Sequence, residues 1–148
     1  MSFRSTLLKV LAAVALACAA FTPAVAAPPA DSIQINYHRV DGNYDKWGVH
    51  LWKSPNMPLD GIEWPVPMVP TGKNDFGVYW VVKANEFNTS KGAKRQVNYI
   101  IHKGDIKEQG GKDMAFNGLE HQEIWVYEND RTIFYSLDEV KAAHKDIK

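Results

Sequence analysis

The chain has 148 residues, and its 17 basic and 17 acidic side chains give a formal net charge of zero. This length allows one domain of ordinary size, with a hydrophobic core large enough to fold by itself. The charge balance gives no electrostatic reason to expect DNA, RNA or an anionic membrane as a partner. All five Trp and all six Tyr lie beyond residue 31, which suggests that some rings serve a surface as well as a core.

The first 26 residues have the organisation of a secretory signal peptide. Arg4 and Lys9 give a basic start, residues 10–20 form an uncharged apolar run, and Ala24-Val25-Ala26 is a small-x-small cleavage site. The run is too short for a permanent membrane span. Cys18, the only cysteine, lies within it and matches a lipoprotein site poorly. We therefore expect a secreted or periplasmic protein without a lipid anchor, free of disulfides once cleaved, with a net charge near −2.

Beyond residue 31 the pattern is one of short strands separated by turn-rich segments. Alternation or enrichment in β-branched and aromatic residues predicts strands at 33–39, 47–53, 76–82, 96–102, 123–127 and 132–135, the last two as a hairpin. No alternation of strands with helices appears. The sequence therefore predicts an all-β fold, an antiparallel β-sandwich.

Two loops and one helix complete the predicted fold. Residues 54–71 contain five prolines and form a long ordered loop that carries Trp64. Residues 103–113 are polar and contain three glycines, which indicates a second loop. Ser136 is a possible N-cap and Glu139 stands three positions later, so a short C-terminal helix is expected over residues 137–147.

The most informative segment is 48–52, Gly-Val-His-Leu-Trp. Successive side chains of a strand point to opposite faces, so Val49 and Leu51 would enter the core while His50 and Trp52 lie on the other face. Rings two residues apart on a strand are separated by about 7 Å, roughly the reach of two neighbouring sugar rings. Two exposed rings with no core to fill indicate a binding surface.

The remaining tryptophans are assigned by the same parity. Trp47 shares the face of Val49 and Leu51, which favours the core, although we keep it as a candidate for the site. Trp80 and Trp125 lie inside predicted strands and are expected in the core. Trp64, among prolines, fits either a core or a surface position.

Other kinds of site have little support. The five histidines form no H-x-H or H-x-x-x-H pair, so no metal site is expected, and no nucleophile elbow or phosphate-binding glycine loop is present. Glu108 and Asp113 share a loop with Lys107 and Lys112. Such a loop is ordinarily a solvated, mixed-charge segment. Beside the ring face, its charged groups could instead bind sugar hydroxyls.

Four blocks of residues carry a family resemblance. They are Ile-Asn-Tyr-His-Arg-x-Asp-Gly-x-Tyr-Asp-x-Trp-Gly-x-His-Leu-Trp at 35–52, Asp-Phe-Gly at 75–77, Ile-Ile-His-Lys-Gly-Asp at 100–105 and Glu-Ile-Trp-Val at 123–126. In this order they closely resemble the pullulanase-associated module, carbohydrate-binding module family 41. The resemblance covers about residues 33–136.

The resemblance implies an immunoglobulin-like β-sandwich that binds α-glucans such as pullulan, amylose and glycogen-type chains. It implies that His50 and Trp52 stack on consecutive glucoses and that Lys107 and Glu108 supply polar contacts. Glu108 stands where the family has Asp, which moves the carboxylate by one methylene; Asp113 is a second candidate for the acidic contact.

The expected organisation is a signal peptide at 1–26, the module at 31–136 and a helical tail at 137–148. Because the chain ends soon after the module, we expect a monomeric binding protein rather than an enzyme. It would have no cofactor and no catalytic residues, and its partners would be an α-glucan and a separate amylolytic enzyme. Two alternatives remain. The first is a small glycoside hydrolase using Glu108 and Asp113, or a fragment associated with a debranching enzyme. The second is a protein-interaction module of the cell envelope.

Overall fold

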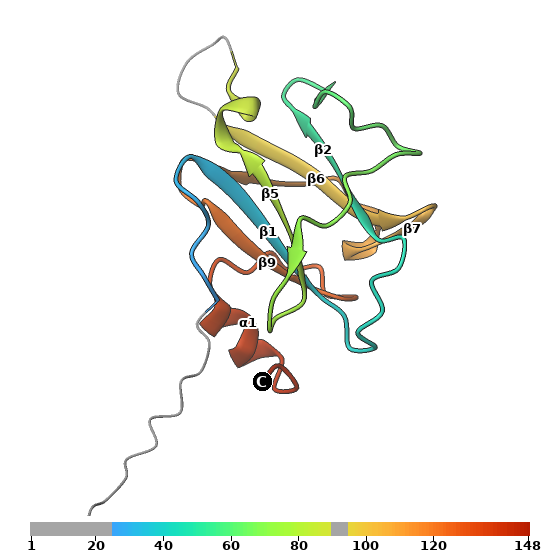
Figure 1. Cartoon of the computed structure of the whole chain (residues 1–148), viewed down its shortest axis with the longest axis vertical. Helices are drawn as coiled ribbons and strands as arrows, with labels where there is room; N and C mark the ends of the chain where they lie inside the picture. Colours follow the sequence, from blue (N-terminus) through green and yellow to red (C-terminus); the bar gives the residue numbers. More distant parts are fainter. Residues whose placement is uncertain (1–24, 90–94) are drawn as a thin grey trace, which may run out of the picture.

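The computed structural model describes residues 25–89 and 95–148. Two sheets face each other, with the strands of one crossing behind those of the other (Figure 1). The first sheet has the order β4-β5-β1-β9, formed by Gly72–Lys73, Val78–Lys83, Ser32–His38 and Glu123–Tyr127. The second has the order β3-β2-β6-β7 and pairs β8 with β6, using Met57–Pro58, Gly48–Lys53, Gln96–Lys103, Ile106–Lys107 and Met114–Asn117.

The all-β sandwich predicted from the sequence is confirmed, with one departure from antiparallel pairing. Every pairing between the named strands is antiparallel except that of β1 with β9, which is parallel. The whole second sheet lies between these two strands in the sequence. The long connection lets the chain return in the same direction, which a tight hairpin would forbid.

Of the hairpin expected over 123–135, the antiparallel return is present but the second strand, 132–135, is not formed. Only one isolated bridge, between Trp125 and Phe134, joins the two segments. Thr132 N donates to the Asp130 side chain at 2.8 Å and Ser136 already caps the following helix, so that between them only Phe134 pairs with β9. The alternation also failed to predict the short strands β3, β4, β7 and β8, of which β3 and β7 lie inside the two segments expected to be loops.

Every second side chain of the strands points inward, and these side chains form the core between the sheets. Val49 and Leu51 of β2 are fully buried, as are Val97, Tyr99 and Ile101 of β6. Trp80 lies in the same cluster with no exposed surface, as predicted. The intervening residues of β2 and β6 therefore lie on the outer face of the second sheet.

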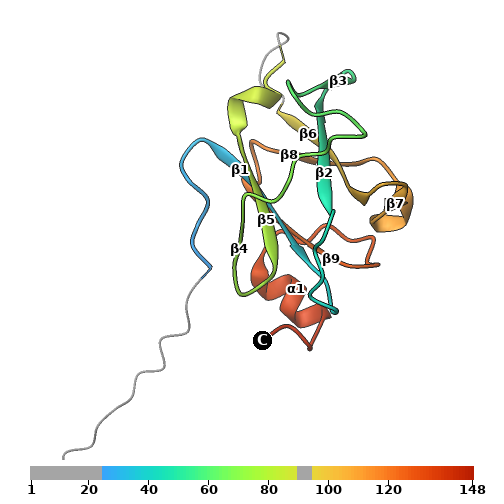
Figure 2. The same ribbon diagram turned by 45° about the vertical axis from the view of Figure 1, so that its right-hand side comes forward.

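The C-terminal helix α1, Leu137–Ala143, covers part of the first sheet beside β9 (Figure 2). The Ser136 hydroxyl accepts a hydrogen bond from Glu139 N at 3.1 Å, as the N-cap prediction requires. The helix ends four residues earlier than expected, yet Ile147 still packs with Val140 and Trp125 in a second apolar cluster.

Within residues 25–89 and 95–148, no helix combines the length and apolar character needed to cross a membrane. Residues 1–24 of the predicted signal peptide, including Cys18, lie outside the described residues.

Candidate functional site

His50 and Trp52 lie side by side on the outer face of the second sheet. Both are half-buried, and their ring centroids are 5.7 Å apart with the planes tilted by 37°. Their strand pairs with β6, which places Ile100 beside His50 and Asn98 beside Trp52. The Asn98 side chain donates to the Trp52 carbonyl at 3.0 Å. Because Val49 and Leu51 are fixed in the core, the strand holds the two rings at a set spacing.

A third ring, Trp64, comes from the long proline-containing loop. Its centroid lies 5.7 Å from that of His50 with an edge-on angle of 66°, and it stacks on His102 at 3.9 Å with the planes only 6° apart. His102 is buried and its Nδ1 lies 2.9 Å from the Gly104 carbonyl, so the imidazole is a fixed support for the indole.

The loop that carries Trp64 is tied to the strands beneath it. Val49 and Met68 exchange two backbone hydrogen bonds of 3.0 and 2.9 Å, and Trp80 Nε1 donates to the Met68 carbonyl at 2.8 Å. Glu63 and Val66 form a bridge that closes the turn around Trp64. The proline-containing segment is thus ordered, as predicted, and presents Trp64 next to β2.

The three rings border a shallow hollow of about 350 Å³. It is lined by His50, Trp52, Asn56, Pro58, Trp64, Ile100 and Asp113. This volume lies at the low end of ordinary small-molecule sites. Aromatic rings, two aliphatic side chains, an amide and a carboxylate form its wall, which combines apolar contact with a few polar groups.

Lys107 adds a positive charge at the rim. Its Nζ lies 4.8 Å from the centroid of the Trp64 ring, a cation–π distance. Lys107 pairs with His102 across β6 and β7, so it stands next to the residue on which Trp64 stacks.

The site also shifts the protonation of His50. Burial in the hollow, and secondarily the neighbouring His102, lower the pKa of His50 below its ordinary value of 6.5. The neutral imidazole is therefore the favoured form at neutral pH.

Two of the residues expected at the site lie elsewhere. Trp47 is 6% exposed and packs in the core, with its ring centroid 5.5 Å from that of Tyr37. Glu108 is 5% exposed, and its carboxylate accepts hydrogen bonds from the Tyr37 hydroxyl and from Asn129 N. The structure therefore brings together His50, Trp52, Lys107 and Asp113, but not Trp47 or Glu108.

Trp64 and its support His102 are the members that the sequence did not assign. The available signal was ambiguous: Ile62, Trp64, Val66 and Met68 alternate with the two-residue period of a strand, but the prolines at 65, 67 and 70 exclude a central strand, so the pattern did not decide where Trp64 points. Among the described residues, no group of three or more His, Cys, Asp or Glu side chains is arranged to hold a metal ion.

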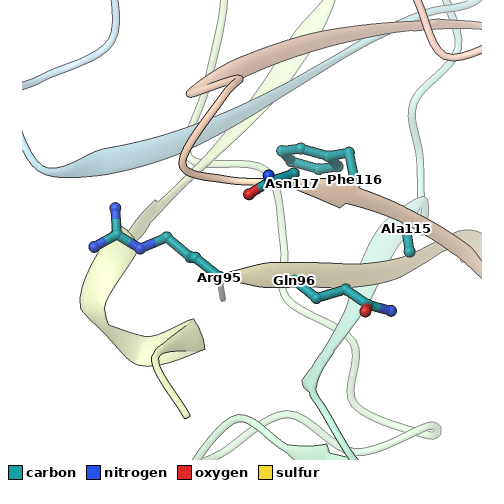
Figure 3. A pocket seen from close by; sticks show the side chains of 5 residues that line it. All are labelled: Arg95, Gln96, Ala115, Phe116 and Asn117. Carbon is teal, nitrogen blue, oxygen red and sulfur yellow. The ribbon is translucent and has the colours of Figure 1, made fainter. Parts of the chain in front are cut away.

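A second hollow, of about 490 Å³, lies where β6 begins and β8 ends. Arg95, Gln96, Ala115, Phe116 and Asn117 line it, and the Phe116 ring points to the opposite side of β8 from Ala115 (Figure 3). Phe116 is 4% exposed and belongs to the core. The described lining thus offers no exposed aromatic face, in contrast to the hollow beside Trp52.

Comparison with known proteins gives consistent relatives. A family profile described as the bacterial pullanase-associated domain matches residues 31–135. An alpha-amylase of Streptomyces lividans is 34% identical over 74 residues, which cover 50% of this chain and 7% of that protein. Pullulanase A of Streptococcus pneumoniae serotype 4 is 27% identical over 111 residues, covering 72% of this chain and 8% of that protein. The chain thus spans less than a tenth of these curated relatives.

Solved structures share the fold. A structure reported as "Alpha-glucan recognition by family 41 carbohydrate-binding modules from streptococcal virulence factors" has a TM-score of 0.58 and 25% identity, over 75% of this chain and 50% of that one. PulA from Klebsiella oxytoca has a TM-score of 0.62 at 18% identity, over 80% of this chain and 12% of that one, and supports the fold alone. Because the family profile covers well over half of the chain, the protein belongs to the bacterial pullanase-associated domain family.

Proposed function

We propose that this protein binds α-glucan chains, without cleaving them, on the outer face of its second sheet. The observation that carries the proposal is the gathering of His50, Trp52 and Trp64 around one shallow hollow with Asp113 in its wall. Solved relatives at 25% and 26% identity are reported as α-glucan-binding modules, which supports this ligand class.

The chemistry of the hollow suits a sugar polymer. The C–H groups on the face of a glucose ring pack against aromatic faces, whereas its hydroxyls need polar partners. His50 and Trp52 would each take one glucose, with Trp64 bounding the hollow edge-on. Asp113 would accept hydrogen bonds from hydroxyls, and Lys107 would donate to them.

Burial of Glu108 supports binding rather than hydrolysis. A glycosidase of this kind would need two carboxylates facing one cleft. The Glu108 carboxylate is enclosed and engaged by Tyr37 and Asn129, so it is unavailable to pair with Asp113 on a bound sugar. The signal-peptide pattern of residues 1–26 supports a location outside the cytoplasm, where α-glucan polymers would be the partner.

The proposal is tested by affinity electrophoresis in gels that contain amylose or pullulan. We expect wild-type protein to be retarded and Trp52→Ala to migrate as in a gel without glucan. Each ring contributes on the order of 1 kcal/mol beyond the burial of its surface, and Trp52→Ala loses both contributions; a Kd in the micromolar range or weaker is expected for the wild type. Tyr135→Ala is the matched control because Tyr135 is an exposed ring, 40% accessible, that does not line the hollow.

Absence of retardation of the wild type on every α-glucan would refute the proposal. Release of reducing sugar from pullulan by the purified protein would refute its non-catalytic part. Loss of retardation in Tyr135→Ala as large as in Trp52→Ala would show that the hollow is not the site.

A further inference from the structure

Lys107 and Glu108 are neighbours in the sequence, but one side chain points to solvent and the other into the interior. The Lys107 side chain is exposed and reaches the Trp64 ring, whereas Glu108 is 5% exposed. Consecutive side chains of an extended segment point in opposite directions, so whatever fixes Glu108 also fixes the direction of Lys107.

Glu108 is held by groups from separate parts of the fold. Its Oε1 accepts from the Tyr37 hydroxyl of β1 and lies 3.5 Å from Arg39 Nη1, while its Oε2 accepts from Asn129 N, just after β9, at 2.9 Å. Burying a carboxylate is costly unless it is paired and hydrogen-bonded. Here both oxygens have partners, which makes this position a well-defined anchor.

The backbone around Glu108 is fixed as well. Glu108 N donates to the Ile101 carbonyl at 2.9 Å, and Gly111 N donates to the Glu108 carbonyl at 2.9 Å. The next residue, Gln109, is also buried, and its side-chain amide donates to the Thr132 carbonyl at 3.3 Å. The chain is thus pinned immediately after Lys107, in addition to the pairing of Ile106 and Lys107 with β6.

We propose that Glu108 is a positioning residue, which sets the place of the Lys107 ammonium at the rim of the hollow. The proposal rests on the proposed glucan binding for its functional meaning. A free lysine loses rotamer entropy when it is ordered on a ligand. Holding its backbone and its position near Trp64 beforehand reduces that loss and so strengthens binding.

Binding measurements in a double-mutant cycle separate positioning from general support. The cycle uses the isosteric variant Glu108→Gln, in which an amide N–H₂ replaces one accepting oxygen, with and without Lys107→Ala. We expect Glu108→Gln alone to weaken maltotetraose binding about threefold, and to change it by less than about 1.5-fold in the Lys107→Ala background. In the His50→Ala background, which leaves Lys107 in place, the threefold effect should persist. Equal weakening with and without Lys107 would overturn the proposal.

A second measurement reads the position of Lys107 without any ligand. Protons of the Lys107 side chain lie near the Trp64 ring and should show an upfield ring-current shift in the NMR spectrum, with Trp64→Ala as the reference that lacks the ring. We expect Glu108→Gln to move this shift toward the reference. Tyr37→Phe, which removes only the hydroxyl that donates to Glu108, should do the same if Glu108→Gln fails to fold.

The two measurements fail in different ways. An unchanged Lys107 shift in Glu108→Gln and Tyr37→Phe would overturn the positioning role whether or not the protein binds glucan. If the wild type binds no α-glucan but the Lys107 shift still moves in the variants, the proposed function is refuted and Glu108 remains the residue that positions Lys107.

Discussion

Trp64 offers the sharpest test of how the hollow is built, because it comes from a loop and not from the strand that carries the other two rings. Trp64→Ala removes the indole that stands edge-on to His50 at 5.7 Å and stacks on His102 at 3.9 Å. The backbone bonds that tie the loop to Val49 through Met68 do not involve this side chain. The substitution should therefore open the hollow without releasing the loop.

The expected magnitudes follow from these contacts. Loss of one aromatic wall should cost about 1 kcal/mol of binding free energy, which is about a fivefold weaker Kd. Loss of the stack on His102 should cost about 1 kcal/mol of unfolding free energy, which lowers Tm by about 4 °C in a domain of this size. Trp64→Phe keeps a flat ring over His102 and should recover most of both quantities.

Isothermal titration with maltotetraose well below Tm measures the first effect, and thermal unfolding measures the second. Val69→Ala is the matched control, since Val69 belongs to the same loop, is 75% exposed and does not line the hollow. Binding by Trp64→Ala within about 1.5-fold of wild type, with Trp52→Ala inactive, would contradict the assignment of Trp64 to the site.

Two further predictions concern protonation and close packing. Because the pKa of His50 is lowered below 6.5, chiefly by burial and then by His102, the unfolded chain takes up the proton first as the pH falls. The stability due to neutral His50 is complete above pH 6.5 and is lost below it. A sugar covering the ring should disfavour the charge further, so fluorescence titrations should show weaker binding at pH 5 than at pH 7.5, and His50→Trp should reduce this difference. Gly77→Ala would place a Cβ 2.1 Å from the Tyr37 carbonyl oxygen and should lower the unfolding free energy, measured in urea, by about 3 kcal/mol. Gly61→Ala meets no atom within 4 Å but has a φ of +77°, so it should lower the unfolding free energy by only about 1 kcal/mol. Equal losses in the two variants would contradict this reasoning.

The parts of the site predictable from the sequence are those governed by strand parity. Val49, His50, Leu51 and Trp52 lie on the faces that alternation assigns to them, because a strand that is buried on one face has its register fixed by that burial. Trp47 likewise follows its parity into the core.

Residues in loops escaped the same reasoning. Glu108 was expected beside the rings because the family resemblance matches it to an acidic contact residue, but its partners Tyr37 and Asn129 are 71 and 21 residues away in the sequence. Trp64 finds its support, His102, on a strand that begins more than 30 residues later. Periodicity carries no information about such pairings, since they depend on how the sheets bring distant loops together. The parallel pairing of β1 with β9 was missed for the same reason.

The division between strand and loop also bears on how the hollow would hold a polymer. The backbones of His50 and Trp52 cannot move apart without displacing Val49 and Leu51 from a close-packed core, so the strand positions that carry these two rings are rigid. Trp64 lies on a loop and Lys107 on the two-residue strand β7, and each is held by a buried neighbour: Trp64 through the bond from Trp80 Nε1 to the Met68 carbonyl, Lys107 through Glu108. A site whose aromatic walls are held in advance loses less entropy on binding. Its modest affinity would then reflect the small number of contacts, and variants that loosen either segment should weaken binding even though they remove no atom that touches the sugar.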